Sequence, residues 1–446
     1  MNDVMAARSQ MAISMGFHII FACIGMVMPF FMAVSHYKWL RSGKERYRNI
    51  TRAWSKGVAI FFVTGAVSGT MLSFELGLLW PGFMKYAGPI IGMPFSLEGT
   101  AFFIEAIALG FFLYGWNKLN RWFHWFSGLV VGLTGLASGI LVVAANSWMN
   151  APTGFIWNHG QVSQVHPFAA MFNPAWIPEA LHMVLAAFAA TGFAVAGVHA
   201  WMVYRGKNED FHYKSFRIAA TFGALAAIIQ PFSGDFSAKS VARLQPAKLA
   251  AIEALYHTQT AAPLMLGGIP DSRNSTVSYG IKIPHLLSLL AFGNSHSVVL
   301  GLDRFPRSDQ PPVGIVHFSF QLMIMLGTLM ALLSLIYLYA EWKNNSWLRS
   351  RFMLKAFILS IPAGFLAVEA GWIVTEVGRQ PWIIYGLLKT GDAVTPMPGI
   401  EYTFYLFSVI YLGLSVMVVF LLYRQIKMVS QLYDPESGTR SDSSIA

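Results

Sequence analysis

Several side chains that could do chemistry lie inside apolar stretches of this sequence. A charge at the centre of a membrane helix costs about 2.5–3.5 kcal/mol, so each such residue needs a physical reason. The segment LAVEAGWIVTEVGRQPW, residues 366–382, shows the problem clearly, because Glu369 lies within an otherwise apolar run. The ionisable residues within apolar runs that we consider are His18, Glu98, Glu105, His182, His317 and Glu369. Met323 is added because its thioether could bind a metal.

Imidazole, thioether and carboxylate groups together form a donor set for iron porphyrins. A His–Met pair holds low-spin haem, and a single imidazole holds haem iron with one position open. The positive metal also favours an ionised carboxylate beside it. Cys23 is the single cysteine, so any haem is held without thioether links. The residue types alone leave other roles open: a lone buried His is commonly an interior hydrogen-bonding residue, Met fills gaps in cores, and intramembrane acids serve transporters as proton relays.

The composition is that of a polytopic helical membrane protein. Of the 446 residues, 55% are hydrophobic and 12% are charged, and the mean hydropathy is +0.52. A soluble protein of this size needs a larger charged surface. The net charge of +10 does not indicate nucleic-acid binding, because the basic residues cluster between the apolar spans. The N-terminus lacks a basic region and a cleavage site, so we expect the first span to be retained.

Nine segments are apolar over the roughly 20 residues that a membrane helix needs. We therefore predict an all-α polytopic membrane protein whose spans cover about 9–37, 57–80, 97–116, 126–150, 179–205, 218–234, 313–342, 356–376 and 403–424. Lys and Arg concentrate in the connections on one side of these spans. The positive-inside rule then places the N-terminus outside and the C-terminus in the cytoplasm.

This topology divides the chain into four parts. Residues 1–234 hold the first six spans, and residues 313–432 hold the last three. Between them, 235–312 forms an extracytoplasmic loop with a short helix predicted over 246–259 (PAKLAAIEALYHTQ). The polar tail, 433–446, is expected to be disordered.

The topology also gives the depth of each candidate, at about 1.5 Å per helical residue. Glu98 is expected to open its helix on the outer side, with Glu105 seven residues further in on the same face. All the candidates fall in the outer half of the bilayer, beside the loop 235–312. Unrelated structural polar residues would not be expected to share one leaflet.

Five segments make the chain similar to a known family. They are EGTAFFIEAIALG (98–110), ANSWMNAPTGF (145–155), MFNPAWIPEALH (171–182), QPAKLAAIEA (245–254) and VEAGWIVTEVGRQPW (368–382). With them the chain resembles subunit I of the cytochrome bd quinol oxidases over essentially its whole length. The short stretch after KLAAIE resembles the short-loop branch, which includes cyanide-insensitive oxidases. The resemblance implies a multi-pass protein of the bacterial cytoplasmic (inner) membrane.

The resemblance implies two haem b groups, one low-spin and one high-spin, and one haem d or a third haem b in its place. His182 and Met323 would be the axial ligands of the low-spin haem. His18 and Glu369 would ligate the two high-spin haems, in an order that the sequence leaves open. Glu98 would supply a further contact at the haem d site. The remaining positions that match the surroundings of the haems are Arg8, Trp372 and Arg379.

The quinol site of the family lies in the long outer loop. Lys248 and Glu253 match its marker positions, and Asp235 is a further candidate. By this resemblance Lys248 would hold the quinol oxygen and Glu253 would accept its proton. One departure is Gln321, because the family often has Arg two residues before the ligating Met323.

The implied function is that of a terminal respiratory oxidase subunit. Ubiquinol or menaquinol would be oxidised at the outer face, and electrons would pass through the low-spin haem to the high-spin pair, where O2 is reduced to water. Cytoplasmic protons would cross most of the bilayer through Glu105 and the polar positions Ser138, Asn146 and Ser147, which makes the reaction electrogenic without a pump. The implied partners are a homologous subunit II in a heterodimer, small single-helix accessory subunits and the lipid membrane, but no nucleic acid. Two alternatives remain: a proton-coupled transporter, and a haem-bearing quinone oxidoreductase lacking oxygen chemistry.

Overall fold

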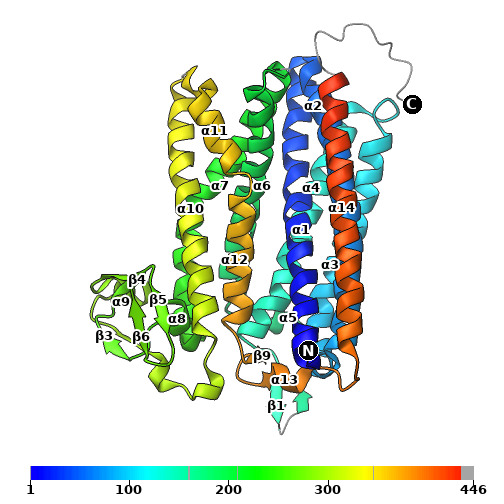
Figure 1. Ribbon diagram of the computed structural model, residues 1–446. Helices are drawn as coiled ribbons and strands as arrows, with labels where there is room; N and C mark the ends of the chain where they lie inside the picture. Colours follow the sequence, from blue (N-terminus) through cyan, green and yellow to red (C-terminus); the bar gives the residue numbers. More distant parts are fainter. Residues whose placement is uncertain (1, 159–160, 208, 345, 433–446) are drawn as a thin grey trace.

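The computed structural model describes residues 2–158, 161–207, 209–344 and 346–432. Within these ranges nine helical segments are long and apolar enough to cross a membrane, which confirms the predicted all-α membrane fold. The helices run side by side in one bundle (Figure 1). The N-terminus and the loop before the yellow-green helix α10 lie at one end of this bundle. The predicted tail, 433–446, lies outside the described residues.

Helices suit a membrane because most of their backbone hydrogen bonds are made within the segment. The spanning helices are α1 (Asp3–Ser42), α2 (Glu45–Leu79), α3 (Pro81–Tyr114), α4 (Arg121–Asn150), α6 (Trp176–Tyr204), α7 (Glu209–Leu244), α10 (Val313–Trp342), the pair α11 (Arg351–Leu359) and α12 (Ala363–Val377), and α14 (Ile400–Leu432). The 40 residues of α1 measure about 60 Å, roughly twice the hydrocarbon thickness. The helices therefore continue past the membrane-buried segments that hydropathy detects.

The start of α3 differs from the expected start at 97. Only Trp80 separates α2 from α3, which begins at Pro81. Proline suits the first turn of a helix, because its missing N–H has no intrahelical partner there. Glu98 consequently lies in the middle of α3 and does not open it.

Helix α7 ends later than the expected 234 and continues to Leu244. Asp235, which the sequence placed in the loop, is therefore a helical residue. The residues after 234 are polar enough to end an apolar window, but nothing in them breaks a helix before Pro246. The short loop helix, expected over 246–259, is observed as α8 (Pro246–Ile252).

The eighth span is two helices rather than the single one expected over 356–376. Helix α11 ends at Leu359 and α12 begins at Ala363. Pro362 lies between them, where its missing N–H and its ring oppose a continuous helix. The hydroxyl of Ser360 donates to the carbonyl of Phe357, which satisfies one of the acceptors that the break exposes.

The helices pack chiefly in sequential pairs, α1 with α2, α3 with α4 and α6 with α7, and α12 lies against both α6 and α10. The pair α6 and α7 approaches closely at two glycines. A Cβ atom on Gly192 would lie 2.4 Å from the Cα of Gly223, so the two backbones touch there. A shared apolar core joins these helices, with Phe193 and Phe357 fully buried and stacked at 5.3 Å.

The loop between α7 and α10 is a small folded unit whose buried core also includes residues of α7, α10 and α12. Its strands pair in a nested antiparallel order: β3 (Gln259–Thr260) with β8 (Val298–Val299), β4 (Leu264–Leu266) with β7 (Ile281–Ile283), and β5 (Ile269–Asp271) with β6 (Thr276–Ser278). Its helical elements are α8, α9 (Leu286–Phe292), η1 (Leu302–Arg304) and η2 (Arg307–Asp309).

Short elements complete the rest of the described chain. They are β1 (Ile156–Asn158), β2 (Gln161–Ser163), α5 (Pro167–Met171), η3 (Ser346–Arg349), β9 (Trp382–Ile384), β10 (Leu388–Lys389) and α13 (Thr390–Ala393). Apart from η3, they gather at the end of the bundle where the N-terminus lies (Figure 1).

Candidate functional site

His18 projects from α1 toward α2. Its Nδ1 lies 2.9 Å from the hydroxyl of Ser68. That hydroxyl donates its single proton to the carbonyl of Thr64 or Gly65, so the imidazole must be the donor in its contact with Ser68. The Nε2 atom of His18 therefore keeps its lone pair, which is the form that binds a metal ion.

His182, on α6, shows the same arrangement with α7. Its Nδ1 lies 3.1 Å from the hydroxyl of Ser233, and that hydroxyl donates to the carbonyl of Gln230. The ring therefore donates from Nδ1 and presents Nε2 unprotonated. The Gln230 amide lies 3.2 Å from this Nε2 and supplies it with a donor.

Glu369 approaches α1 at the level of His18 but from another side. A Cβ atom on Gly16 would lie 3.3 Å from Oε2 of Glu369. Two positions along a helix are about 200° apart around its axis, so Glu369 and His18 occupy roughly opposite faces of α1. The structure thus brings these two candidates to one height without bringing them into one pocket. Oε1 of Glu369 is buried and has no hydrogen-bond partner among the described residues.

Each of the four candidate iron ligands faces a glycine on a neighbouring helix. An added Cβ would lie 3.0 to 3.5 Å from the ligand side chain at every one of these positions. The pairs are His18 with Gly69, His182 with Gly234, Met323 with Gly371, and Glu369 with Gly16. Glycine at these positions lets the neighbouring helix backbone approach each candidate side chain closely. His182 and Met323 themselves pack against different helices, α7 and α12.

Glu98 and Glu105 lie along the interface of α3 and α4. The hydroxyl of Ser138 donates to Oε1 of Glu98 over 2.9 Å. Glu105 is buried, and a Cβ on Gly135 would lie 3.4 Å from both of its oxygens. The two carboxyl groups therefore follow one face of α3, as their spacing predicted.

The structure also assembles a buried polar network that the sequence did not single out. Its centre is Asn150, the last residue of α4. Its Oδ1 accepts hydrogen bonds from Gln245 (3.2 Å), from the Lys248 amine (3.2 Å) and from Nη1 of Arg379 (3.0 Å). Its amide donates to Glu179 over 2.9 Å. The start of the loop and the end of α12 therefore meet on one side chain.

The network continues from Arg379 to the neighbouring acids. Nη2 of Arg379 forms an ion pair with Glu376, which also accepts from the amide of Asn146. Asn146 thus faces the end of α12, and Ser147 bonds to Asn173, so neither extends the Glu98–Ser138 contact. The Nε atom of Arg379 is buried without a partner among the described residues.

Lys248 and Glu253 are both buried, at 2% and 4% exposure, but they face different partners. Lys248 turns toward Asn150, and Oε2 of Glu253 accepts from the backbone N–H of Met265 over 3.2 Å. Burial raises the pKa of Glu253 to about 7, against the opposing effect of that N–H. Burial lowers the pKa of Lys248, and the Arg379 guanidinium lowers it further. Asp235 instead pairs with Lys239 one turn along α7, at 2.6 Å.

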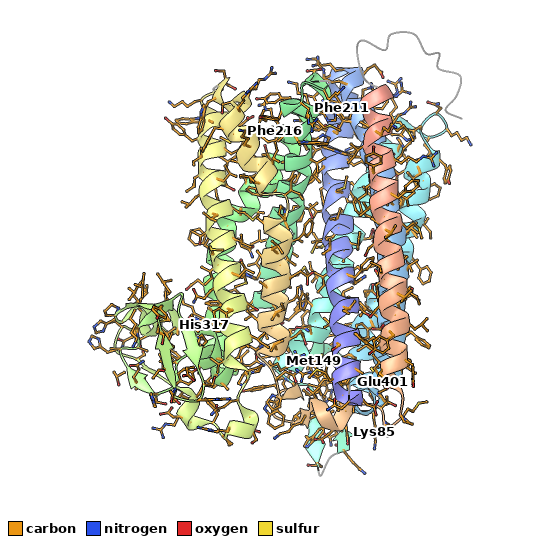
Figure 2. All side chains as sticks on the ribbon, viewed as in Figure 1. Lys85, Met149, Phe211, Phe216, His317 and Glu401 are labelled. Carbon is orange, nitrogen blue, oxygen red and sulfur yellow. The ribbon has the colours of Figure 1, made fainter. Side chains whose placement is uncertain are left out.

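Two residues of α10 tie the loop to the bundle. His317 is fully buried, with Nδ1 2.7 Å from the carbonyl of Ile252 and Nε2 3.1 Å from that of Gly267. One turn later Gln321 donates to the carbonyl of Met265 and accepts from the N–H of Gly267. Figure 2 shows His317 where α10 meets the loop. Both nitrogens of His317 are thus used by the loop, so it is not a haem-ligand candidate.

Arg8 and Trp372, the remaining two candidates, form no hydrogen bond or ion pair among the described residues. Arg8 is half-buried in the first turns of α1. Trp372 is half-buried and packs against the main apolar core.

Comparisons with known proteins show which family the chain belongs to. The sequence pattern of the family described as cytochrome bd terminal oxidase subunit I matches residues 6–429. The chain belongs to this family.

Individual members of the cytochrome bd subunit I family match over nearly their whole length. The chain is 34% identical to a putative cytochrome bd menaquinol oxidase subunit I of Bacillus subtilis, over 95% of this chain and 96% of that one. It is 31% identical to cytochrome bd ubiquinol oxidase subunit 1 of the same organism, over 96% and 94%. The solved structure of bd oxidase from Geobacillus thermodenitrificans superposes with a TM-score of 0.90, at 31% identity, over 96% of this chain and 99% of that one.

Membership of this family selects the quinol oxidase interpretation over the proton-coupled transporter. It also establishes a multi-pass protein of the inner membrane. The family implies haem, and the residue types present fit haem: His18 and His182 each have an unprotonated Nε2, although that of His182 lies 3.2 Å from the Gln230 amide, and Oε1 of Glu369 is buried without a partner among the described residues.

Sequence reasoning missed Asn150, Glu179 and Glu376, although each lies in a segment that carries the family resemblance. Their polarity was the available signal, since all three stand at the ends of apolar spans.

Proposed function

We propose that this subunit I oxidises quinol at the loop-bearing face and reduces O2 to water, in a complex with a homologous subunit II. The observation that carries this proposal is the hydrogen bonding of His18 and His182, whose Nδ1 atoms lie 2.9 Å and 3.1 Å from serine hydroxyls. In both rings Nδ1–H donates a hydrogen bond to a serine hydroxyl, because that hydroxyl itself donates to a backbone carbonyl. Both therefore offer a metal-binding nitrogen within membrane helices, which a transporter does not require.

The candidate ligands hold three haems in this proposal, namely two haem b and one haem d or third haem b. His182 and Met323 hold the low-spin group, and His18 and Glu369 hold the two high-spin groups. When bound, the haems supply electron transfer and the reduction of O2. Ser68 and Ser233 fix the tautomer and orientation of the two imidazoles, as hydrogen-bond partners of metal-bound histidines do. The unpartnered Nε of Arg379 suits a haem carboxylate.

Quinol oxidation belongs at the junction of the loop and the bundle. Lys248 donates to a quinol oxygen, and Glu253 accepts a quinol proton, for which a pKa near 7 is suitable. Protons released there leave on the outer side. Support for this location comes from Asn150, which joins Lys248 of the loop to Arg379 at the end of α12.

Protons for oxygen reduction are taken from the cytoplasmic side in this proposal. Glu105 and Glu98 hold them in turn along α3, with Ser138 as a hydrogen-bond partner of Glu98. Orientation follows the positive-inside rule, with the N-terminus and loop outside and the C-terminus inside. The reaction is then electrogenic without a pump.

Optical spectra of the purified complex test the function directly. We expect a reduced-minus-oxidised spectrum with a Soret band, and a further change on adding carbon monoxide to the reduced enzyme. A complex with no Soret absorption, after expression with ample haem, overturns the proposal. Haem bands without a carbon-monoxide response instead indicate a quinone oxidoreductase that lacks oxygen chemistry.

A further inference from the structure

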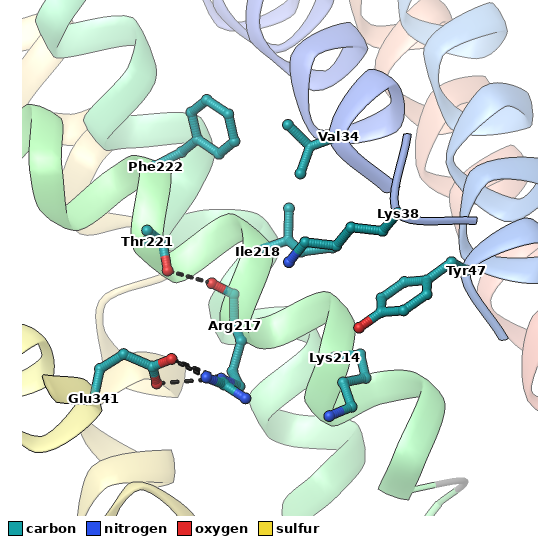
Figure 3. Close-up of a pocket in the computed structure, with 9 residues that line it drawn as sticks. All are labelled: Val34, Lys38, Tyr47, Lys214, Arg217, Ile218, Thr221, Phe222 and Glu341. Atoms are coloured by element: carbon teal, nitrogen blue, oxygen red, sulfur yellow. Dashed lines mark hydrogen bonds and ion pairs between the residues drawn. The ribbon is translucent and has the colours of Figure 1, made fainter. Parts of the chain in front are cut away.

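A basic cavity opens at the end of the bundle opposite the loop. Its volume is about 180 Å³. Helices α1, α2, α7 and α10 each contribute to its walls (Figure 3). The nine lining residues are Val34, Lys38, Tyr47, Lys214, Arg217, Ile218, Thr221, Phe222 and Glu341. None of them belongs to the proposed haem or quinol sites.

The charges in this cavity do not balance. Arg217 and Glu341 neutralise each other, because the guanidinium binds both carboxylate oxygens. Lys38 and Lys214 remain. The Lys38 amine lies 5.8 Å from the ring of Tyr47, and among the described residues neither lysine has an ion pair.

The nearest further acid does not remove this excess. Asp210 acts electrostatically on Lys214, but it already forms an ion pair with Arg46 at 2.5 Å. The lining therefore carries two uncompensated positive charges within one small space. Such a site attracts an anion, and basic pockets between membrane helices are sites for lipid phosphates.

The cavity also changes character with depth. Its polar residues lie near helix ends, Lys38 close to the end of α1 and Glu341 next to the end of α10. Val34 and Phe222 lie further toward the middle of the bundle, and Figure 3 shows them on the opposite side of the cavity from Lys214 and Glu341. A phosphate with an attached apolar chain has the same order of polar and apolar parts.

We propose that this cavity binds a phosphate group, with Lys38 and Lys214 as its cationic ligands and the Tyr47 hydroxyl beside them. The group comes from the headgroup of an anionic phospholipid or from free phosphate. A purely structural explanation is that both lysines extend to the membrane interface without binding anything. The proposal does not depend on the oxidase activity, and it is tested without measuring turnover.

The test uses the purified complex after removal of loosely bound lipid. The thermal unfolding temperature is followed by the Soret band while phosphatidylglycerol, phosphatidylcholine or inorganic phosphate is titrated. We expect phosphatidylglycerol to raise this temperature in a saturable way, and phosphatidylcholine not to. The variant Lys38→Gln/Lys214→Gln should weaken the apparent affinity at least about tenfold, which is the loss expected from removing two charge-assisted contacts.

A matched control carries Lys118→Gln and Lys355→Gln, two exposed lysines outside the cavity, and should bind as the wild type does. A shift with inorganic phosphate alone, lost in the cavity variant, identifies the free anion as the occupant. A shift with phosphatidylglycerol alone identifies the lipid. The proposal is wrong if the cavity variant and the control respond equally, or if no anion shifts the wild type.

Loss of folding in the double variant is detected by its haem absorbance before titration. In that case Lys38→Arg/Lys214→Arg, which keeps both charges, should bind as the wild type does, and Lys214→Gln alone should bind more weakly. The proposal is also overturned if Lys38→Arg/Lys214→Arg and Lys214→Gln bind the anion with equal affinity.

Discussion

The amine of Lys248 donates a hydrogen bond to Oδ1 of Asn150 over 3.2 Å, although 98 positions separate the two residues. The same oxygen accepts from Arg379, 229 positions away. One amide thus fixes the loop to the bundle and the end of α4 to the end of α12. Buried networks of this kind are costly when only partly satisfied.

Replacement of Asn150 should therefore destabilise the subunit. In Asn150→Ala, the donors of Lys248, Gln245 and Arg379 lose a shared acceptor, which should cost at least about 2 kcal/mol. The free energy of unfolding in denaturant, measured on the complex, checks this. Asn117→Ala, at an exposed position between α3 and α4, should change it by less than about 0.5 kcal/mol. Equal effects of the two substitutions would contradict a central role for Asn150.

Glu369 should be required for one high-spin haem. Glu369→Gln and Glu369→Ala remove the carboxylate whose Oε1 has no partner among the described residues, so one of the three haems should be lost while the fold survives. Pyridine haemochrome analysis of the purified complex measures the haem content. Glu45→Gln, which removes a surface carboxylate paired with Arg48, should leave it unchanged. Full haem content in both Glu369 variants would refute the assignment.

Quinol oxidation should depend on the ionisation of Glu253. Burial raises the pKa of its carboxyl from 4.5 to about 7, so below pH 7 most of the folded protein holds this group protonated and unable to accept a quinol proton. We expect kcat/KM for quinol to fall about tenfold per pH unit below 7 and to level off above it. Glu253→Gln should lower kcat/KM above pH 7 and abolish its decrease below pH 7. Asp271→Asn, at another loop carboxylate, should preserve this decrease. A decrease that persists in Glu253→Gln assigns the titration elsewhere.

The same raised pKa has a defined effect on stability. The folded state binds this proton more tightly than the unfolded chain. The burial of Glu253 therefore lowers the free energy of unfolding least below pH 4.5, where the group is protonated in both states. The cost grows as the pH rises from 4.5 and is complete above about 7.

Gln321 should hold the loop in place. Gln321→Ala leaves the carbonyl of Met265 and the N–H of Gly267 without their side-chain partner, so the loop should open more often. We expect limited proteolysis within the loop to become roughly tenfold faster, with unchanged haem spectra. Gln425→Ala, which removes a contact to the Ala53 carbonyl, should leave loop cleavage unchanged. Unaltered cleavage in Gln321→Ala would show that His317 suffices.

This role also bears on the departure from the family pattern. Arginine has no acceptor atom, so an Arg at 321 could donate to Met265 but could not accept from Gly267. Glutamine does both, as the two contacts show.

Glu105 should limit oxygen reduction rather than quinol binding. Glu105→Gln removes an ionisable group from the α3–α4 interface, and kcat should fall at least about tenfold with little change in KM for quinol. Oxygen consumption at several quinol concentrations separates the two constants. Thr100→Ala, on the exposed side of α3, should behave as the wild type. A raised KM with normal kcat would place Glu105 outside the proton route.

The fold was largely predictable, because each span is an apolar run long enough to be recognised without its neighbours. The ends of α3 and α7 were not, since a helix continues into polar sequence that hydropathy excludes. Spacing also predicted the shared face of Glu98 and Glu105, which lie on one helix. The polarity of Asn150 could mark it as a candidate, but its partners could not be predicted, because they are 95, 98 and 229 positions away. Only tertiary packing brings them together.

The contact between Gly192 and Gly223 has a mechanical consequence. Because α6 and α7 touch through their backbones there, neither helix can slide or roll freely past the other. A bilayer that is too thin or too thick for these helices is then accommodated by tilting the pair as one rigid body. We therefore expect the distances from His182 to Ser233 and Gln230 on α7 to change little with lipid composition.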